Sequence, residues 1–371
     1  MTHEQYMKIA IEEAEGGCGW VNPNPVVGAV IVRQGEIIGR GHHQSCGGPH
    51  AERNALAACS ENPAGATLYV TLEPCCHYGR TPPCTDAIIE SGIGTVVIGA
   101  KDPNALVCGK GIKDLQRQGV RVVCGVLEEE CKRQNEVFFH YITHGTPFTV
   151  MKYAMTIDGK IATATGKSRW ITGDAARKHV HFCRHKYAGI MVGIGSVLAD
   201  DPLLTCRMPG GRNPVRIVCD TNLRIPLDAQ IVKTAGLSDV IVATAAAEGE
   251  KAQLLRERGV QVIPASKKSG HLDLNELMKI LGGKQIDSVL LEGGAALHAA
   301  ALESGIVNKV QAYIAPKIFG GENAKSAVGG IGMDEPDEAY RLSDRRLTLL
   351  GEDMLLEYTL KGDQDHVYRD R

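Results

Sequence analysis

The sequence predicts an α/β protein of two domains, and three observations support this. Its 371 residues are more than one hydrophobic core usually serves. Apolar residues make up 43% of the chain, charged residues 23% and aromatic residues 5%, which is typical of a globular α/β protein. Strand-like and helix-like segments alternate in two successive series, and such alternation predicts sheets covered by helices.

The first series fills the N-terminal part of the chain. Its opening helix is apolar at Met7, Ala10, Ile11 and Ala14, which gives one face for packing. A charged helix over 128–145 closes the series, and 145–148 is typical of a linker. Between them we expect strands at 25–32, 36–40, 66–72, 95–100 and 120–125, with helices after Pro49, from Thr85 and near 111–118.

The second series predicts another α/β domain, so that the two domains should cover 1–146 and 147–365. Its helices are expected at 174–186 and 295–305, and the polar end from 363 onward should fray. Its strands are expected at 148–156, 189–195, 215–220, 239–245, 260–264, 287–294 and 309–316.

Charge and composition exclude several classes of partner. The net charge of −2 gives no diffuse field for nucleic acid or an anionic membrane, and no apolar run approaches the ~18 residues that span a bilayer. The acidic N-terminus does not resemble a signal peptide, so the twelve cysteines are expected to be reduced thiols in the cytoplasm. We therefore expect a small-molecule partner, no nucleic acid and no membrane. The sequence leaves a homo-oligomer open.

A metal site is predicted where His50 and Glu52 follow Pro49. Residues two apart face different ways on a helix, so these two can share a site only where the helix begins. Downstream, Cys75 and Cys84 lie in a loop that follows a predicted strand. One imidazole and two thiolates give zinc three protein ligands and leave the fourth position for water, the pattern of a catalytic site.

Glu52 fits the remaining part of this chemistry. Zinc lowers the pKa of bound water to roughly 7, and a carboxylate that does not bind the metal can carry the proton of that water to the substrate. Cys76 is the nearest rival ligand. A closed structural site would result if His42, His43 or Cys46 supplied a fourth ligand, and Glu52 would then lack a purpose.

Later motifs in the chain are modest by themselves. The segment "LLEGGAALHAAAL" joins a buried-type strand, a Gly-Gly turn and a helix start, which aims backbone N–H groups at a phosphate. The segment "GIGSVLADDPLLTCR" also sets a glycine-rich turn after a strand. Neither matches the G-x-G-x-x-G fingerprint, so a Rossmann domain is not indicated.

The motifs together resemble a known family. H-x-E followed by P-C is the signature of zinc deaminases, and "PCCHYGRTPPC" resembles the deaminase of riboflavin biosynthesis. The segments "MKYAMTIDGKIA", "GKSRWIT", "VGIGSVLADDPLLTCR", "VRIVCD" and "EGGAALH" occur in the order of the reductase half of the bifunctional riboflavin biosynthesis proteins. The resemblance implies a cytidine-deaminase-like three-layer domain followed by a dihydrofolate-reductase-like α/β domain.

The resemblance also implies the reactions and the cofactors. With Zn²⁺, activated hydroxide would deaminate a 2,5-diamino-6-ribosylamino-pyrimidinone 5′-phosphate. With NADPH, the ribosyl group of the product would be reduced to ribityl. Two alternatives differ from this interpretation. One is a zinc deaminase of a nucleic-acid base with a C-terminal binding domain, which would need a basic and aromatic surface. The other is a non-catalytic zinc protein.

Site residues are carried over from the resemblance position by position. The resemblance places the pyrimidine near four residues of the first domain: Asn24, His43, Asp102 and Asn104. It places NADPH near six residues of the second domain: Ala154, Trp170, Ser196, Asp200, Thr221 and Gly294. It places the sugar phosphate near five more: Ser168, Arg184, Leu204, Arg207 and Glu292. Lys152, Asp158 and Glu292 are the polar groups that we consider for proton delivery to the sugar ring oxygen.

Overall fold

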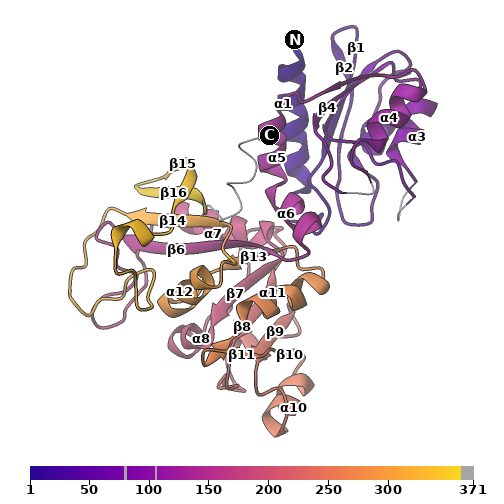
Figure 1. Ribbon diagram of the computed structural model, residues 1–371. Helices are drawn as coiled ribbons and strands as arrows, with labels where there is room; N and C mark the ends of the chain where they lie inside the picture. The colour runs from indigo at the N-terminus through magenta and orange to yellow at the C-terminus, as the bar shows by residue number, and fades with distance from the viewer. Residues whose placement is uncertain (79–81, 105–106, 361–371) are drawn as a thin grey trace. The chain divides into compact units, whose positions relative to one another are not determined.

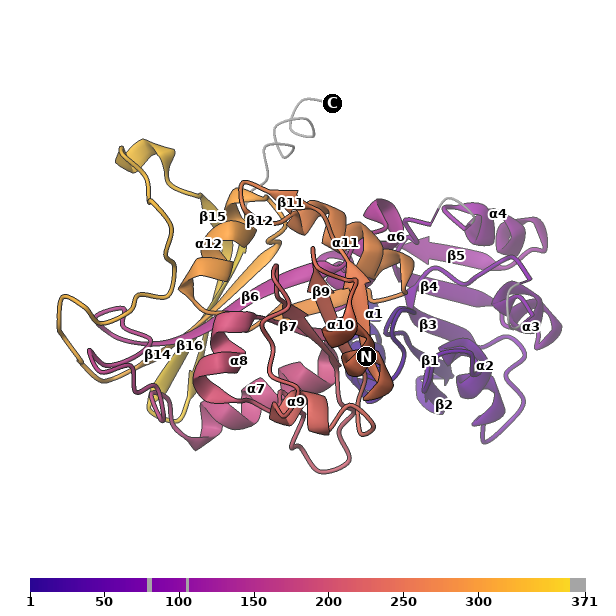
Figure 2. The same ribbon diagram turned by 90° about the horizontal axis from the view of Figure 1, so that it is seen from below.

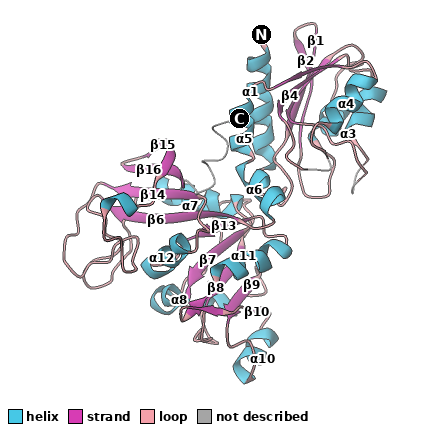
Figure 3. Cartoon of the chain, in the orientation of Figure 1, coloured by secondary structure: helices cyan, strands magenta, loops and turns pink. Residues whose placement is uncertain are grey.

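The computed structural model describes residues 1–78, 82–104 and 107–360, and it divides the chain into two compact units. The first unit ends at Gly145 and the second begins at Thr146 (Figure 1). Each unit holds a sheet with helices (Figure 3), so the predicted α/β class is confirmed. The polar tail and the stretch 361–365 of the second expected domain lie outside the described residues.

The first unit contains a five-stranded sheet in the order β2-β1-β3-β4-β5. β1 pairs antiparallel with β2 and β3, whereas β3, β4 and β5 run parallel. The strands are β1 Gly28–Arg33, β2 Glu36–His42, β3 Thr67–Leu72, β4 Thr95–Ala100 and β5 Arg121–Cys124. The helices are α1 His3–Ala14, α2 Ala51–Ala57, α3 Cys84–Glu90, α4 Lys110–Arg117, α5 Glu128–Gln134 and α6 Glu136–His144.

Helices cover both faces of this sheet, which gives three layers. Figure 1 shows α1, α5 and α6 on one side and α3 and α4 on the other. The helix α2 packs closely on β2 because two glycines of the strand face it. A Cβ at Gly39 would lie 2.5 Å from the carbonyl oxygen of Ala55, and one at Gly41 would lie 2.3 Å from the nitrogen of Ala55. Small residues at this contact therefore fix the position of α2.

The helix predicted over 128–145 is wrong as a single element, because Asn135 interrupts it. Asn135 lies between α5 and α6 with φ −107° and ψ 21°. Its side chain accepts a hydrogen bond from the Val26 N–H at 2.8 Å and donates to the Val26 carbonyl at 2.9 Å. The buried amide of Asn135 thus satisfies the backbone N–H and carbonyl groups of Val26, as a neighbouring strand otherwise would. The two residues are 109 positions apart, so the sequence pattern does not reveal this contact.

The second unit contains a nine-stranded sheet in the order β10-β9-β8-β7-β13-β6-β14-β16-β15. The seven strands from β10 to β14 run parallel, and β16 and β15 continue the sheet antiparallel. The strands are β6 Phe148–Thr156, β7 Gly189–Gly193, β8 Val215–Cys219, β9 Val240–Thr244, β10 Val260–Pro264, β13 Ser288–Leu291, β14 Lys309–Ala315, β15 Leu342–Leu350 and β16 Asp353–Leu360. A separate hairpin pairs β11 Lys267–Lys268 with β12 His271–Leu272.

The α-helices that the structure describes in the second unit, six within residues 146–360, bury the two faces of the sheet. Figure 2 shows α11 and α12 on one side of β6 and β7, and α7, α8 and α9 on the other. Alternate residues of one strand supply the two cores: Met191 packs with α11 and α12, whereas Ile190 and Val192 pack with α8, α9 and α10. The helices are α7 Asp174–Lys186, α8 Ile194–Asp200, α9 Gln230–Lys233, α10 Glu250–Glu257, α11 Leu274–Gly283 and α12 Ala295–Glu303.

The hairpin of β15 and β16 was not predicted from the sequence. The charged pair Arg345 and Arg346 lies inside β15, and the pairing register shifts between Ser343 and Arg346. This irregularity removes the clean alternation that identifies a half-buried strand.

Two predictions about composition can be compared with the described residues. All twelve cysteines, which lie within the described ranges, are unbridged. Within those same ranges, no helix combines the length and the apolar character that crossing a membrane requires.

A substitution at the contact between β2 and α2 tests how this helix is positioned. We expect Gly41→Ala to lower the free energy of unfolding of the first unit by about 1–3 kcal/mol, because the added methyl group overlaps the α2 backbone. Chemical denaturation followed by circular dichroism measures the loss. Gly94→Ala is the control, since its Cβ would meet its nearest atoms at 3.4 Å. Equal losses in the two variants would contradict this packing argument.

Candidate active sites

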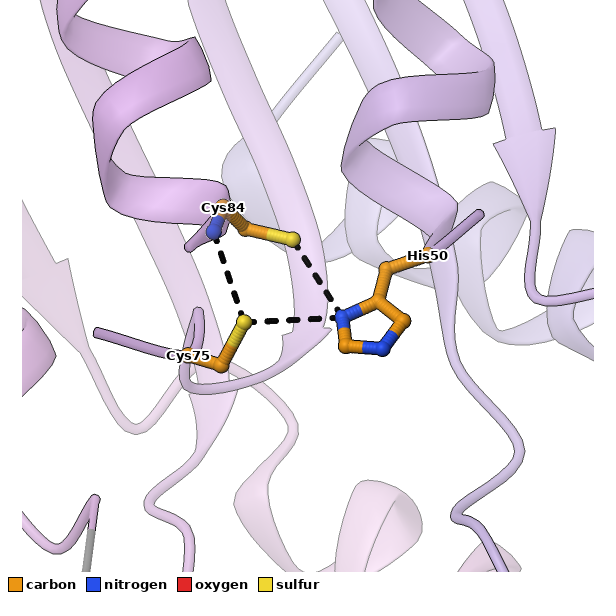
Figure 4. A group of neighbouring side chains, drawn as sticks. All are labelled: His50, Cys75 and Cys84. Carbon is orange, nitrogen blue, oxygen red and sulfur yellow. Dashed lines mark hydrogen bonds between the residues drawn. The ribbon is translucent and has the colours of Figure 1, made fainter. Parts of the chain in front are cut away.

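Three potential metal ligands converge in the first unit (Figure 4). The Nδ1 atom of His50 lies 3.5 Å from Sγ of Cys75 and 3.4 Å from Sγ of Cys84. His50 is the N-cap of α2, Cys75 follows β3, and Cys84 is the first residue of α3. The loop between the two cysteines includes 79–81, outside the described residues. One imidazole and two sulfurs so placed fit a tetrahedral zinc ion with one position left for water.

The electrostatics of this group favour a cation. A hydrogen bond with Cys84 lowers the pKa of the Cys75 thiol, which also accepts the backbone N–H of Cys84 at 3.3 Å. The same hydrogen bond raises the pKa of Cys84, since two neighbouring sulfurs resist carrying two negative charges. A divalent cation between the sulfurs removes this repulsion, so the donor set fits zinc.

Glu52 lies beside the three ligands in the first turn of α2 and is only 3% exposed. Burial raises the pKa of its carboxyl group, and the negative charge of Cys75 raises it further. A carboxyl group with a raised pKa beside a metal site is suited to accept and return a proton.

The closed four-ligand alternative finds no support among the described residues. The metal-ligating group there consists of His50, Cys75 and Cys84 alone, without Cys76 or Cys46. His42 instead bonds Glu13 at 2.9 Å. The site is therefore of the open type within the part of the chain that the structure describes.

His43 is not a metal ligand, because both of its ring nitrogens contact other residues of the chain. Its Nδ1 lies 3.0 Å from the Pro49 carbonyl oxygen, and its Nε2 lies 3.1 Å from the side-chain nitrogen of Asn24. Burial lowers the pKa of His43, which favours the neutral ring. A neutral ring that donates to Pro49 accepts from Asn24, so His43 fixes the amide of Asn24. The His43 and His50 rings are 5.3 Å apart, which brings Asn24 and His43 to the site.

Asp102 and Asn104 follow the neighbouring strand β4. Asp102 accepts the N–H of Asn104 at 2.8 Å, and burial raises its pKa to about 6. The buried carboxylate of Glu73, which the sequence analysis did not single out, holds this loop by accepting the N–H groups of Asp102, Gly109 and Ile112. The loop also includes 105–106, which lie outside the described residues.

Arg53 was also missed by the sequence analysis. Its guanidinium donates to the carbonyl oxygens of Pro82 at 3.3 Å and Pro83 at 2.8 Å. These bonds join the helix of His50 to the residues that precede Cys84. No local pattern could identify this role, because it depends on a tertiary contact between segments about 30 residues apart.

In the second unit, two adjoining cavities open at the carboxyl ends of β6, β7 and β13. Their volumes are about 980 Å³ and 300 Å³, in the range of cofactor and ligand pockets. Most of the residues predicted for this unit line one cavity or both: Lys152, Ala154, Ser168, Trp170, Arg184, Ser196, Asp200, Leu204, Arg207, Glu292 and Gly294.

A buried charge cluster lies between these cavities. The Glu292 carboxylate accepts two hydrogen bonds from Arg184, at 2.8 and 3.0 Å, and lies 3.6 Å from Nζ of Lys152. Burial acts to raise the pKa of Glu292, but the positive charges of Arg184 and Lys152 lower it to about 2. Arg184 also donates to the Thr205 carbonyl at 3.1 Å. Glu292 is therefore ionised at neutral pH.

Trp170 and Arg207 lie at the exposed side of the cavities. Trp170 is 59% exposed, and the Arg177 guanidinium lies over its ring at 4.7 Å, a contact that the sequence analysis missed. Arg207 donates from Nε to Nε2 of His181 at 3.2 Å. Burial, followed by the charges of Arg184 and Arg207, lowers the pKa of His181 to about 4, so that its neutral ring can accept this bond.

Two predicted residues do not line the described cavities. Asp158 accepts hydrogen bonds from Thr156 at 2.5 Å and from the backbone of Phe319 and Gly320 at 3.2 and 2.8 Å. The bond from Thr156 lowers its pKa, and these partners tie a loop together. Thr221 follows β8, one strand beyond β7.

The turn between β13 and α12 fits a phosphate-bearing cofactor. A Cβ at Gly293 would lie 2.8 Å from the end of the Leu297 side chain and 3.0 Å from its Cβ, so a larger residue here would require Leu297 to shift. Gly294 is the N-cap of α12 and lines the larger cavity together with Ser196. Backbone N–H groups at a helix start and a cavity of this size suit a dinucleotide.

Comparisons with known proteins agree with this arrangement. Residues 1–100 match the family described as the cytidine and deoxycytidylate deaminase zinc-binding region, and residues 147–356 match the RibD C-terminal domain. The riboflavin biosynthesis protein RibD of Actinobacillus pleuropneumoniae is 53% identical over 360 residues, covering 97% of this chain and 96% of that protein. The corresponding protein of Aquifex aeolicus is 42% identical over 95% of this chain and 97% of that protein.

Solved structures extend the likeness to three dimensions. The structure of Acinetobacter baumannii RibD matches with a TM-score of 0.87 and 34% identity, covering 97% of this chain and 99% of that one. A Thermotoga maritima protein, described as a diaminohydroxyphosphoribosylaminopyrimidine deaminase and 5-amino-6-(5-phosphoribosylamino)uracil reductase, matches with a TM-score of 0.84 and 40% identity, with the same coverage. The chain thus belongs to the RibD family of riboflavin biosynthesis proteins and is a bifunctional enzyme, a zinc-dependent deaminase and an NADPH-dependent reductase.

Proposed function

We propose that the first domain, 1–146, deaminates a 2,5-diamino-6-ribosylamino-pyrimidinone 5′-phosphate, and that the second, 147–365, reduces the ribosyl group of the product to ribityl. The observation that carries the proposal is the open group of His50, Cys75 and Cys84 with the buried carboxyl of Glu52 beside it. The Thermotoga maritima relative, described as a deaminase and reductase of these substrate classes, supports the choice of substrate.

In the deaminase site, Glu52 is the proton carrier. His50, Cys75 and Cys84 would hold a zinc ion, which would lower the pKa of a bound water molecule and so make it available for attack on the amino-bearing ring carbon. Glu52 would carry one proton of this water to the ring nitrogen, and would then carry the second proton, from the oxygen now bonded to the ring carbon, to the amino group, so that the C–N bond breaks and ammonia leaves. The amide of Asn24, fixed by His43, binds the edge of the pyrimidine ring, and Asp102 and Asn104 close the same site.

In the reductase site, Lys152 is the proton donor. NADPH, when bound, would supply a hydride to C1′, and the ring oxygen of the sugar would gain a proton as its bond to C1′ breaks. Glu292 cannot give this proton at neutral pH because its pKa is about 2. The carboxylate of Asp158 accepts hydrogen bonds within its own loop, including one from the N–H of Gly320. Lys152, in the smaller cavity and 3.6 Å from Glu292, remains.

Different residues of the same two cavities bind the phosphate of the substrate and the NADPH cofactor. Arg184 is committed to Glu292 and Thr205, so Arg207 binds the sugar phosphate at the exposed side, with Ser168 and Leu204 beside it. Trp170 and Ala154 would flank the nicotinamide, and Ser196, Asp200, Thr221 and Gly294 would hold the rest of NADPH. A small-molecule reaction of this kind involves no nucleic acid, and we place the enzyme in the cytoplasm.

Replacing Glu52 separates catalysis from metal binding. We expect Glu52→Gln to retain zinc and to lower the rate of ammonia release by about 10²–10⁴-fold, because the amide cannot carry a proton. Elemental analysis and an ammonia assay with the diaminopyrimidinone ribosylamine phosphate measure the two properties. The exposed Glu61→Gln is the control. A Glu52→Gln enzyme with full activity would exclude this role and favour a non-catalytic zinc site.

Neighbouring cysteines test the ligand set. Cys75→Ser is expected to lose most of its zinc and its deaminase activity, because a hydroxyl group is a poor zinc ligand. Cys76→Ser should keep both, since Cys76 is outside the ligand group. The zinc content of the purified variants is the measurement. Zinc loss in Cys76→Ser with zinc retained in Cys75→Ser would reverse the assignment.

Lys152 can be tested without disturbing the deaminase. We expect Lys152→Arg to preserve the charge beside Glu292 yet lower the rate of NADPH oxidation by about 10²–10⁴-fold, because arginine does not release its proton. Ammonia release and NADPH binding should remain. Asp158→Asn is the matched comparison and should stay active. Loss of reduction in Asp158→Asn, with full reduction in Lys152→Arg, would transfer the role to Asp158.

A further inference from the structure

Lys267, on the β11–β12 hairpin, extends toward the loop that follows β8. Its Nζ donates a hydrogen bond to Oδ1 of Asn222 at 3.3 Å, and Asn222 directly follows Thr221. We propose that Lys267 recognises the 2′-phosphate of NADPH and so makes the reductase prefer NADPH to NADH. This inference rests on the proposed function, because it assigns the far end of the cofactor whose nicotinamide lies near Trp170.

Strand register places the hairpin, which follows β10, on the same sheet edge as the cofactor cavity, with the loops after β8 and β9 between them. Gly193, which lines the larger cavity, pairs with Cys219 of β8, Cys219 pairs with Ala243 of β9, and the next residue of β9 pairs with Pro264 of β10. The loops after these parallel strands therefore leave the sheet at one edge. Neighbouring strands are about 4.8 Å apart, so the loop after β8 is about one strand spacing from the cavity wall.

A surface of small residues separates Thr221 from the hairpin. Ala245 and Ala246 follow β9 directly, and both are exposed. The Ala245 N–H donates to the Thr221 carbonyl at 3.1 Å, which fixes the two loops against each other. A nucleoside can lie on such a surface without displacing a side chain, with its ribose toward the cation of Lys267.

The geometry of the hairpin distinguishes its two lysines. Lys267 pairs with Leu272, which is 7% exposed and packs in the core, whereas Lys268 pairs with the exposed His271. Paired residues share a face of a hairpin, and neighbouring residues lie on opposite faces. Lys267 therefore faces the body of the unit and Lys268 faces away. The turn is held by Ser269 and Gly270, both with positive φ, at 51° and 81°.

The chemistry of the cofactor supplies the reason for a cation here. NADPH differs from NADH by one phosphate on the adenosine ribose, and a lysine ammonium forms a charge-assisted hydrogen bond with such a group. With a net charge of −2, the chain offers no general attraction for a dianion, so the discrimination has to come from local groups, and the Lys267 ammonium is suited to it. The hydrogen bond to Asn222 positions the Lys267 ammonium next to Thr221 before the cofactor binds.

Direct binding measurements on the intact protein test this proposal without relying on turnover. Calorimetric titration with NADPH and with NADH gives a dissociation constant for each nucleotide. We expect Lys267→Ala to raise the Kd for NADPH about tenfold and to leave the Kd for NADH within twofold, since one charged hydrogen bond is lost. Lys268→Ala, the matched control, should change neither, and Lys267→Arg should retain most of the preference for NADPH.

Each contrary outcome has a distinct meaning. Equal weakening of both nucleotides by Lys267→Ala would overturn the proposal, because Lys267 would then support only the loop. An unchanged Kd for NADPH in Lys267→Ala would overturn it as well. Wild-type protein that binds neither nucleotide would overturn the reductase assignment itself, whereas wild-type protein that binds both equally would overturn the proposal alone.

Discussion

Both sites depend on one constraint, that parallel strands end at the same edge of a sheet. In the first unit, β3 and β4 run parallel, so Cys75 and Asp102, which follow them, emerge together. In the second unit, β6, β7 and β13 run parallel, and Glu292 and the turn at Gly293 emerge beside the cavities. Loops at such an edge carry polar groups from distant parts of the chain while the strands remain apolar. In both units, therefore, the site is assembled from loops that follow neighbouring parallel strands.

The two sites use buried charge differently. In the deaminase, the pKa of the Cys75 thiol is lowered whereas the pKa of the neighbouring Cys84 thiol is raised, because two adjacent thiolates repel each other. A cation between the two sulfurs removes this repulsion. In the reductase, the carboxylate of Glu292 already has its cations, Arg184 and Lys152, within the chain. The first arrangement is completed by a metal ion, and the second is complete before any ligand arrives.

Much of the fold and of the first site could be predicted because the signals are local. His50 and Glu52 are close in sequence at the start of a helix, and the cysteines lie in one loop, so residue type and spacing were informative. Contacts between distant segments were not accessible to this reasoning. The hydrogen bonds between Asn135 and Val26 span 109 residues, and Asn135 interrupts the helix that the sequence predicts over 128–145. The contacts of Arg53 with Pro83 and of Arg177 with Trp170 carry no sequence pattern either.

Asn135 also has a consequence for synthesis of the chain. The segment just before β1 carries Asn24, and its backbone at Val26 is satisfied by an amide that leaves the ribosome more than a hundred residues later. The segment before β1 is therefore held by Asn135, a residue near the C-terminal end of the first unit. Until Asn135 has been synthesised, the backbone N–H and carbonyl groups of Val26 lack their native partner and stay hydrated. The segment before β1 therefore cannot take its final position until the end of the first unit has left the ribosome.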